Sequence, residues 1–137
     1  MISLTVLWRI LLGAIVGMLV GLGTSRHSVR LFAMVGAASA LLTVASTEFF
    51  KILAFPWYSD PGRLSAQIIS AVGFFGTGLI WISEKNQVRG LSVAASLWLV
   101  AILGILIGVG LDKVSVLAVF FVVVVYWLAG KITNWNN

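Results

Sequence analysis

The sequence predicts an all-α integral membrane protein, a single bundle of five transmembrane helices over residues 1–137. Hydrophobic residues make up 61% of the chain and charged residues 9%, whereas soluble domains contain about 45–50% and about 25%. The apolar residues also gather in five runs of about 20 residues, the length that a helix needs to cross a bilayer. So little polar surface cannot cover a water-soluble globule, and the bilayer is therefore the expected solvent.

The five predicted spans follow one another along the whole chain and are separated by short polar segments. The last of these, "LDK", is so short that the fourth and fifth spans are expected to form a tight antiparallel hairpin. The runs are continuously apolar and show no alternation, which favours helices over the strands of a membrane barrel. The predicted spans are residues 4–23, 29–50, 61–82, 90–111 and 114–130.

The charged residues bear on partners and on orientation. The net charge is +5, but the basic residues lie singly or in pairs at the edges of the apolar runs. This distribution argues against nucleic acid as a partner and suits the surface of a lipid bilayer. Five spans place the termini on opposite sides. The loops on the C-terminal side carry slightly more Lys and Arg, so the positive-inside rule favours an outside N-terminus and a cytoplasmic C-terminus.

Small residues recur four positions apart in the first four predicted spans, as in Gly104–Gly108. This spacing puts them on one helix face and lets two backbones approach closely. Two uses stay open: packing inside the bundle, and an interface with a second copy of the chain. The fifth span is bulky and has no such face, so we expect it at the periphery, toward lipid. The glycines predicted to serve helix packing are Gly73, Gly76, Gly78, Gly90, Gly104 and Gly108.

A line of polar residues runs along the third predicted span. Asp60 precedes a proline and suits the capping position of a helix, and Arg63 follows three residues later, within reach of its carboxylate. The line then continues at steps of four, three, four and three, which is one face of a helix. We expect this face to be turned toward protein and away from acyl chains. Its members are Arg63, Gln67, Ser70, Phe74 and Thr77.

The fourth span repeats the pattern with Arg89, Ser92 and Ser96 at steps of three and four. The polar residues have two open interpretations: a functional site, or simple hydrogen bonds between helices with arginines that reach the membrane surface. No metal site is predicted, because the chain has four acids, one histidine and no cysteine. The residues of the predicted functional polar face are Asp60, Arg63, Gln67, Ser70, Arg89 and Ser96.

Two stretches, "DPGRLSAQIISAVGFFGTG" and "VRGLSVAASLWLVAILGILIGVG", resemble conserved patterns of the MgtC/SapB family of bacterial inner-membrane proteins. The resemblance implies a five-span membrane domain that is linked to growth under magnesium limitation. It also implies a regulatory role on other membrane machinery, including the F-type ATP synthase. Many members carry a C-terminal cytoplasmic domain, so we expect this chain to correspond to their N-terminal transmembrane domain only.

The sequence departs from the family pattern in its first loop. The loop reads "GLGTSRHSVR", where the family usually has a G-L-E-R-E run, so a cation site near this loop is in doubt. A non-enzymatic regulator or accessory factor with a membrane-protein partner is expected, with a small ion carrier or channel for Mg²⁺ as the alternative. No catalytic pair or cofactor motif points to an enzyme, and no cofactor is expected.

Overall fold

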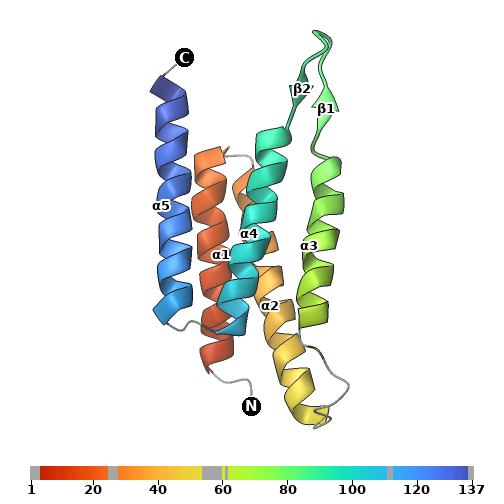
Figure 1. Cartoon of the computed structure of the whole chain (residues 1–137), viewed down its shortest axis with the longest axis vertical. Coiled ribbons are helices and arrows are strands. Elements are labelled where there is room, and N and C mark those ends of the chain that lie inside the picture. The colour runs from red at the N-terminus through yellow and green to blue at the C-terminus, as the bar shows by residue number, and fades with distance from the viewer. Residues whose placement is uncertain (1–3, 25–27, 54–59, 61, 111–112, 136–137) are drawn as a thin grey trace.

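A computed structural model describes residues 4–24, 28–53, 60, 62–110 and 113–135 of the chain. Its described residues form five helices that lie side by side and run alternately in opposite directions, with a short β-hairpin between the third and the fourth (Figure 1). The all-α prediction is therefore confirmed. The elements are α1 (Leu4–Thr24), α2 (Val29–Leu53), α3 (Gly62–Thr77), β1 (Trp81–Ile82), β2 (Val88–Arg89), α4 (Leu91–Val109) and α5 (Lys113–Trp135).

The helices differ in how well they suit a bilayer. By length and composition, α1, α2 and α4 could each cross a membrane, and α5 contributes a shorter apolar stretch, Ser115–Lys131. Helix α3 has 16 residues, about 24 Å at 1.5 Å per residue, against roughly 30 Å of hydrocarbon. The prediction of a continuous helix over residues 61–82 is thus wrong in its last part, because the helix ends at Thr77.

The chain leaves α3 through a hairpin that the sequence analysis did not predict. Trp81 pairs with Arg89 and Ile82 with Val88 in antiparallel register. The turn between them is closed by hydrogen bonds from the Ser83 amide to the Gln87 carbonyl and from the Asn86 amide to the Ser83 carbonyl, both at 2.9 Å. Asn86 adopts φ 59, a left-handed conformation that asparagine tolerates better than most residues. The polar segment is therefore a turn with two short strands.

Glycines bring α1, α2 and α4 into backbone contact. A Cβ added to Gly13 of α1 would lie 2.6 Å from the carbonyl oxygen of Gly36 in α2, and one added to Gly104 of α4 would lie 2.7 Å from the same oxygen. A Cβ on Gly108 would lie 2.7 Å from the Ala40 carbonyl oxygen. Because only hydrogen fits in these places, the small-residue rows of the three helices are used inside the bundle.

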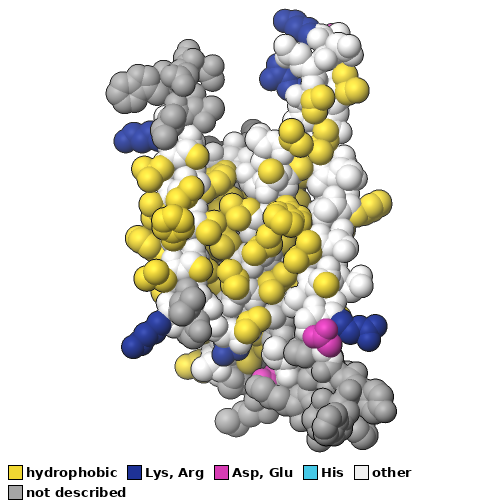
Figure 2. Space-filling view, in the orientation of Figure 1, with side chains coloured by type: hydrophobic (Ala, Val, Ile, Leu, Met, Phe, Trp, Pro, Cys, Tyr) yellow, Lys and Arg dark blue, Asp and Glu magenta, His cyan; other side chains and the backbone are white. Residues whose placement is uncertain are grey.

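The outer helices attach to this centre with apolar side chains. Ile68 and Val72 of α3 and Leu97 and Val100 of α4 belong to one buried cluster. Helix α5 packs against it with part of its surface and leaves large side chains such as Leu117 exposed. The prediction that the last helix lies at the periphery is confirmed. Figure 2 shows apolar side chains over the middle of this view and basic side chains toward its two ends.

Arg9 has a role that the sequence did not reveal. Its guanidinium donates a hydrogen bond of 3.2 Å to the carbonyl oxygen of Gly108, in the last turn of α4. The last four carbonyl groups of a helix lack partners inside the helix, and a cation there also meets the negative end of the helix dipole. Arg9 thus links α1 to the end of α4.

We expect Arg9→Ala to lower the free energy of unfolding by about 1–2 kcal/mol, since it removes both interactions from a half-buried site. The measurement is unfolding by SDS titration in detergent micelles. Arg30→Ala, which removes an exposed arginine at the start of α2, serves as the control. Equal stability of the two variants would contradict the role given to Arg9.

Candidate functional site: the polar face of α3

Asp60 begins α3 in the way that its sequence context predicts. Its carboxylate oxygen Oδ1 accepts a hydrogen bond of 2.8 Å from the Gly62 amide, and its carbonyl accepts one of 3.2 Å from the Arg63 amide. A side-chain oxygen that satisfies an early amide of a helix is an N-cap. Pro61 lies outside the described residues. The sequence therefore fixes the start of α3 and, with it, the rotation of every following side chain.

Helix α3 has two opposite faces. The residues it buries, Ile68, Val72 and Gly76, follow one another at steps of four. Val72 is nine residues beyond Arg63, which at 3.6 residues per turn corresponds to about 180° around the helix axis. The row Arg63, Gln67, Ser70, Phe74 and Thr77, which we call the polar face of α3, therefore points directly away from the packed row.

Within the single chain this polar face points away from the other helices, so a protein that covers it would have to be a second chain. Arg63, Gln67, Ser70 and Thr77 are all exposed, and Phe74 is 76% exposed. The opposite row, Ile68, Val72 and Gly76, is the one that α3 buries, and at Gly76 it lies in ordinary contact distance of α4, where an added Cβ would be 3.6 Å from the Ala94 Cβ. Inside the chain, the apolar row therefore packs against α4.

The polar side chains of this face differ in how they are satisfied. The Ser70 hydroxyl donates to the Ala66 carbonyl at 3.3 Å and the Thr77 hydroxyl to the Phe74 carbonyl at 2.7 Å, both within α3. Gln67 makes no such bond in the part of the chain that the structure describes, and its side chain is exposed. An unpaired amide costs free energy in hydrocarbon.

Gly73 and Gly78 do not pack against a neighbouring helix. A Cβ on Gly73 would meet nothing within 4 Å, and one on Gly78 would meet the Phe75 carbonyl oxygen of its own turn at 3.4 Å. Gly73 lies beside the polar face and leaves a flat, open strip there. A second helix could approach this strip as closely as α1 approaches α2.

Arg89 and Ser96 lie elsewhere. Arg89 belongs to β2, is exposed, and donates a hydrogen bond of 2.9 Å to the Gln87 side-chain oxygen. Ser96 is buried in α4 and donates to the Ser92 carbonyl at 2.8 Å. The six residues predicted as one functional face therefore occupy three places: the start and outer face of α3, the hairpin, and the inside of the bundle.

The acids that the structure describes do not form a cluster. Among the described residues there is no group of three or more His, Cys, Asp or Glu side chains that could hold a metal ion. Asp60 and Glu84 are both exposed and lie in different segments, at the start of α3 and in the hairpin turn. What the site offers is therefore an exposed strip of hydrogen-bonding and small residues on an otherwise apolar surface.

Comparison with known proteins identifies the family to which the chain belongs. The model of the MgtC family matches residues 4–135. An uncharacterized protein of Haemophilus influenzae is 30% identical over 94% of this chain and 56% of its own length. The protein MgtC of Salmonella typhimurium is 34% identical over 87% of this chain and 48% of its own length. A protein of Escherichia coli K12, named as a candidate magnesium transporter, YhiD, is 33% identical over 78% and 52%.

The chain therefore spans about half the length of these three relatives. No solved structure matches it. The matched region covers all five helices, including α3 and the segment that follows it.

Proposed function

The chain belongs to the MgtC family of membrane proteins, and on that premise we propose that it is a non-enzymatic regulator or accessory factor of the bacterial inner membrane. In this proposal it binds another membrane protein through the polar face of α3, and its activity is linked to magnesium limitation and membrane energetics. All five helices cross the membrane, α3 with the help of the residues that follow it.

The observation that carries the proposal is the exposed Gln67 amide on the polar face. Around it the surface offers the hydroxyls of Ser70 and Thr77, the open strip at Gly73 and the projecting ring of Phe74. Acyl chains cannot hydrogen-bond the amide or the hydroxyls, whereas a second helix can use each of these groups by hydrogen bonding, close approach or packing. The same residues lie in the stretch that carries the family pattern, so the partner surface and the family motif coincide.

The orientation in the proposal follows from charge. In the sequence, the segments on the C-terminal side of the five-helix arrangement contain five basic residues, Arg26, Arg30, Lys85, Arg89 and Lys131. The segments on the opposite side contain four, Arg9, Lys51, Arg63 and Lys113. The positive-inside rule places the richer end in the cytoplasm, with the C-terminus. A reporter enzyme fused to the C-terminus should therefore be active only if it works in the cytoplasm.

Site-directed crosslinking tests the proposed surface. Single cysteines at Gln67 and Ser70 are introduced into the chain, which has no cysteine of its own, and native membranes are treated with a short reagent that carries one thiol-reactive and one photoreactive group. We expect discrete products from both positions, and their masses separate a second copy from another protein. A cysteine at Leu117, which is 72% exposed on α5, is the matched lipid-facing control. If all three positions yield equally little product, the polar face has no partner.

Gln67→Leu measures the contribution of the amide. Hydrogen bonds between membrane helices contribute about 0.6 kcal/mol on average and up to about 1.7, so partner capture should fall roughly 3- to 18-fold. Gln67→Asn keeps an amide and should retain part of the binding, whereas Val116→Leu on the exposed side of α5 should leave it unchanged. If the Gln67→Leu variant captured as much partner as the unaltered protein, the Gln67 amide would not be part of the interface.

A small Mg²⁺ carrier or channel is the second candidate, and the name of the Escherichia coli relative favours it. The polar face lies on the outside of the single chain, so a pathway along it would need a second copy to enclose it. Purified protein in liposomes decides the matter. Mg²⁺ flux that Asp60→Ala abolishes would replace the regulatory proposal by this one, and the absence of flux from a protein that still crosslinks would support the regulator.

A further inference from the structure

A cavity of about 1010 Å³ opens between α1, α4 and α5, away from the polar face of α3. It lies where α1 ends, α4 begins and α5 approaches its C-terminal end, which is the end of the bundle that also carries Arg30, Lys85 and Arg89. Its size is at the upper end of the range for ligand pockets. The lining residues are Gly23, Thr24, Ser92, Val93, Ser96, Val123, Val124, Tyr126, Trp127, Leu128, Ala129, Gly130 and Lys131.

One polar contact links α1 and α5 beside the cavity. The hydroxyl groups of Thr24 in α1 and Tyr126 in α5 are hydrogen-bonded to each other. The Tyr126 ring fills the space beside Gly23, where an added Cβ would lie 2.8 Å from its Cε1 atom. A large ring thus separates α5 from its neighbours at this level, and beyond it the lining residues of α4 and α5 do not close the gap.

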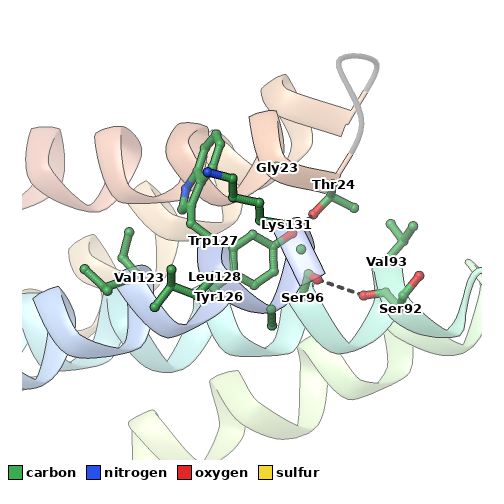
Figure 3. A pocket seen from close by; sticks show the side chains of 13 residues that line it. Gly23, Thr24, Ser92, Val93, Ser96, Val123, Tyr126, Trp127, Leu128 and Lys131 are labelled. Atoms are coloured by element: carbon green, nitrogen blue, oxygen red, sulfur yellow. Dashed lines mark hydrogen bonds between the residues drawn. The ribbon is translucent and has the colours of Figure 1, made fainter. Parts of the chain in front are cut away.

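The walls of the cavity combine apolar side chains, hydroxyl groups and one cation. Val93, Val123 and Leu128 give an apolar surface, the hydroxyls of Ser92 and Ser96 lie on α4, and Lys131 comes from the last part of α5. Figure 3 shows the Lys131 side chain running beside the Trp127 ring, with the two serines on the neighbouring helix. None of the lining residues is an acid, so the cation at this site has no opposite charge within the lining.

We propose that this cavity binds an anionic phospholipid of the surrounding membrane. An apolar space beside hydrocarbon is filled by acyl chains, because water finds few partners on such walls. At the membrane surface, Lys131 and the serine hydroxyls can hold a phosphate group, as basic pockets between membrane helices do. Trp127 and Lys131 are also residue types that favour the interface between hydrocarbon and headgroups. The inference is independent of the partner proposed for α3.

The test is lipid retention by the full chain. The protein is reconstituted in equal amounts of phosphatidylglycerol, which is anionic, and phosphatidylcholine, which has no net charge, and retained lipids are counted by native mass spectrometry. We expect phosphatidylglycerol to be preferred by about fivefold, the effect of one basic residue near the membrane surface. Lys131→Gln should abolish the preference. Lys85→Gln, which removes an exposed lysine from the hairpin turn, should keep it.

A second variant tests the cavity itself. Gly130 lines it, and a Cβ there would meet nothing within 4 Å, so Gly130→Leu fills space without moving the backbone. We expect it to lose the retained lipid, whereas Val125→Phe, which adds volume to a residue of α5 that is 46% exposed, should not. Full retention by Gly130→Leu, or equal behaviour of Lys131→Gln and Lys85→Gln, would overturn the proposal. So would displacement of the lipid by an equal concentration of glycerol phosphate, which would mean that the acyl chains contribute nothing.

Discussion

Gly36→Leu should prevent the helices from assembling although they still enter the membrane. Gly36 is the point at which α1, α2 and α4 meet: its carbonyl oxygen faces both Gly13 and Gly104, and a Cβ on Gly36 itself would overlap the Gly13 carbonyl oxygen. The Val100 side chain, 3.3 Å from that Cβ, closes the third side. Because the Cβ itself overlaps, no leucine rotamer avoids the clash, and α1 and α2 must move apart.

The expected cost is about 3 kcal/mol or more, the upper part of the range for side chains forced into a well-packed core. Close packing is also the main attraction between helices in lipid, so separating two backbones weakens the whole α1–α2 interface. The measurement is unfolding by SDS titration, together with size-exclusion chromatography of the purified protein. Gly36→Ala should show a smaller loss in the same direction.

Gly73→Ala is the matched control, because it makes the same change in a helix where a Cβ meets nothing within 4 Å. Alanine is also a better helix former than glycine, so this variant should be at least as stable as the unaltered protein. If Gly36→Ala and Gly73→Ala behaved alike, the contact at Gly36 would not be a constraint.

These glycines also show what the sequence could predict about the fold. The four-residue spacing of small residues in the first, second and fourth spans identified faces of close approach, and the structure uses them. The spacing did not say which face meets which, because a glycine row is suited to any partner. The choice among α1, α2 and α4 depends on side chains such as Phe32 and Val100, whose fit becomes visible only when the helices are placed together.

The candidate site shows a different limit. The periodicity of the polar face and the Asp60 cap were both readable in the sequence, and the structure contains both. What the sequence did not indicate was where in the bundle this face would lie. Polar residues in membrane helices usually face protein, but this rule does not say whether the protein belongs to the same chain. On α3 the apolar row opposite was the better match for α4, which left the polar face outside.

Gly90→Ala should disrupt the connection between α3 and α4. Gly90 adopts φ 83, a left-handed conformation that costs other residues about 1–2 kcal/mol. An added Cβ would also overlap the Leu79 carbonyl oxygen and lie 2.9 Å from the Trp81 ring. The residue cannot simply rotate away, because its own carbonyl accepts the Ala94 amide at 2.9 Å in the first turn of α4.

Gly90→Ala should again lower the free energy of unfolding by about 3 kcal/mol. The conformational cost at residue 90 and the cost of displacing the Leu79 backbone add to give this value. The damage should be concentrated in the hairpin, where hydrogen exchange at the Ser83 and Asn86 amides, both hydrogen-bonded in the structure, should speed up. Asn86→Gly is the matched control: it changes a residue with φ 59 in the same hairpin to the one that adopts this conformation freely, so protection should persist.

The two glycine variants therefore separate two kinds of constraint. Gly36 lies in a regular helix and is needed only for space, so its effect should grow with side-chain size from alanine to leucine. Gly90 is needed for its conformation as well as for space, so most of its effect should already appear with alanine. If hydrogen exchange at the Ser83 amide were unchanged in Gly90→Ala, the Leu79 backbone would move aside at little cost in free energy. The hairpin would then not fix the end of α3, and the direction of its polar face would depend on the Asp60 cap and the packed row alone.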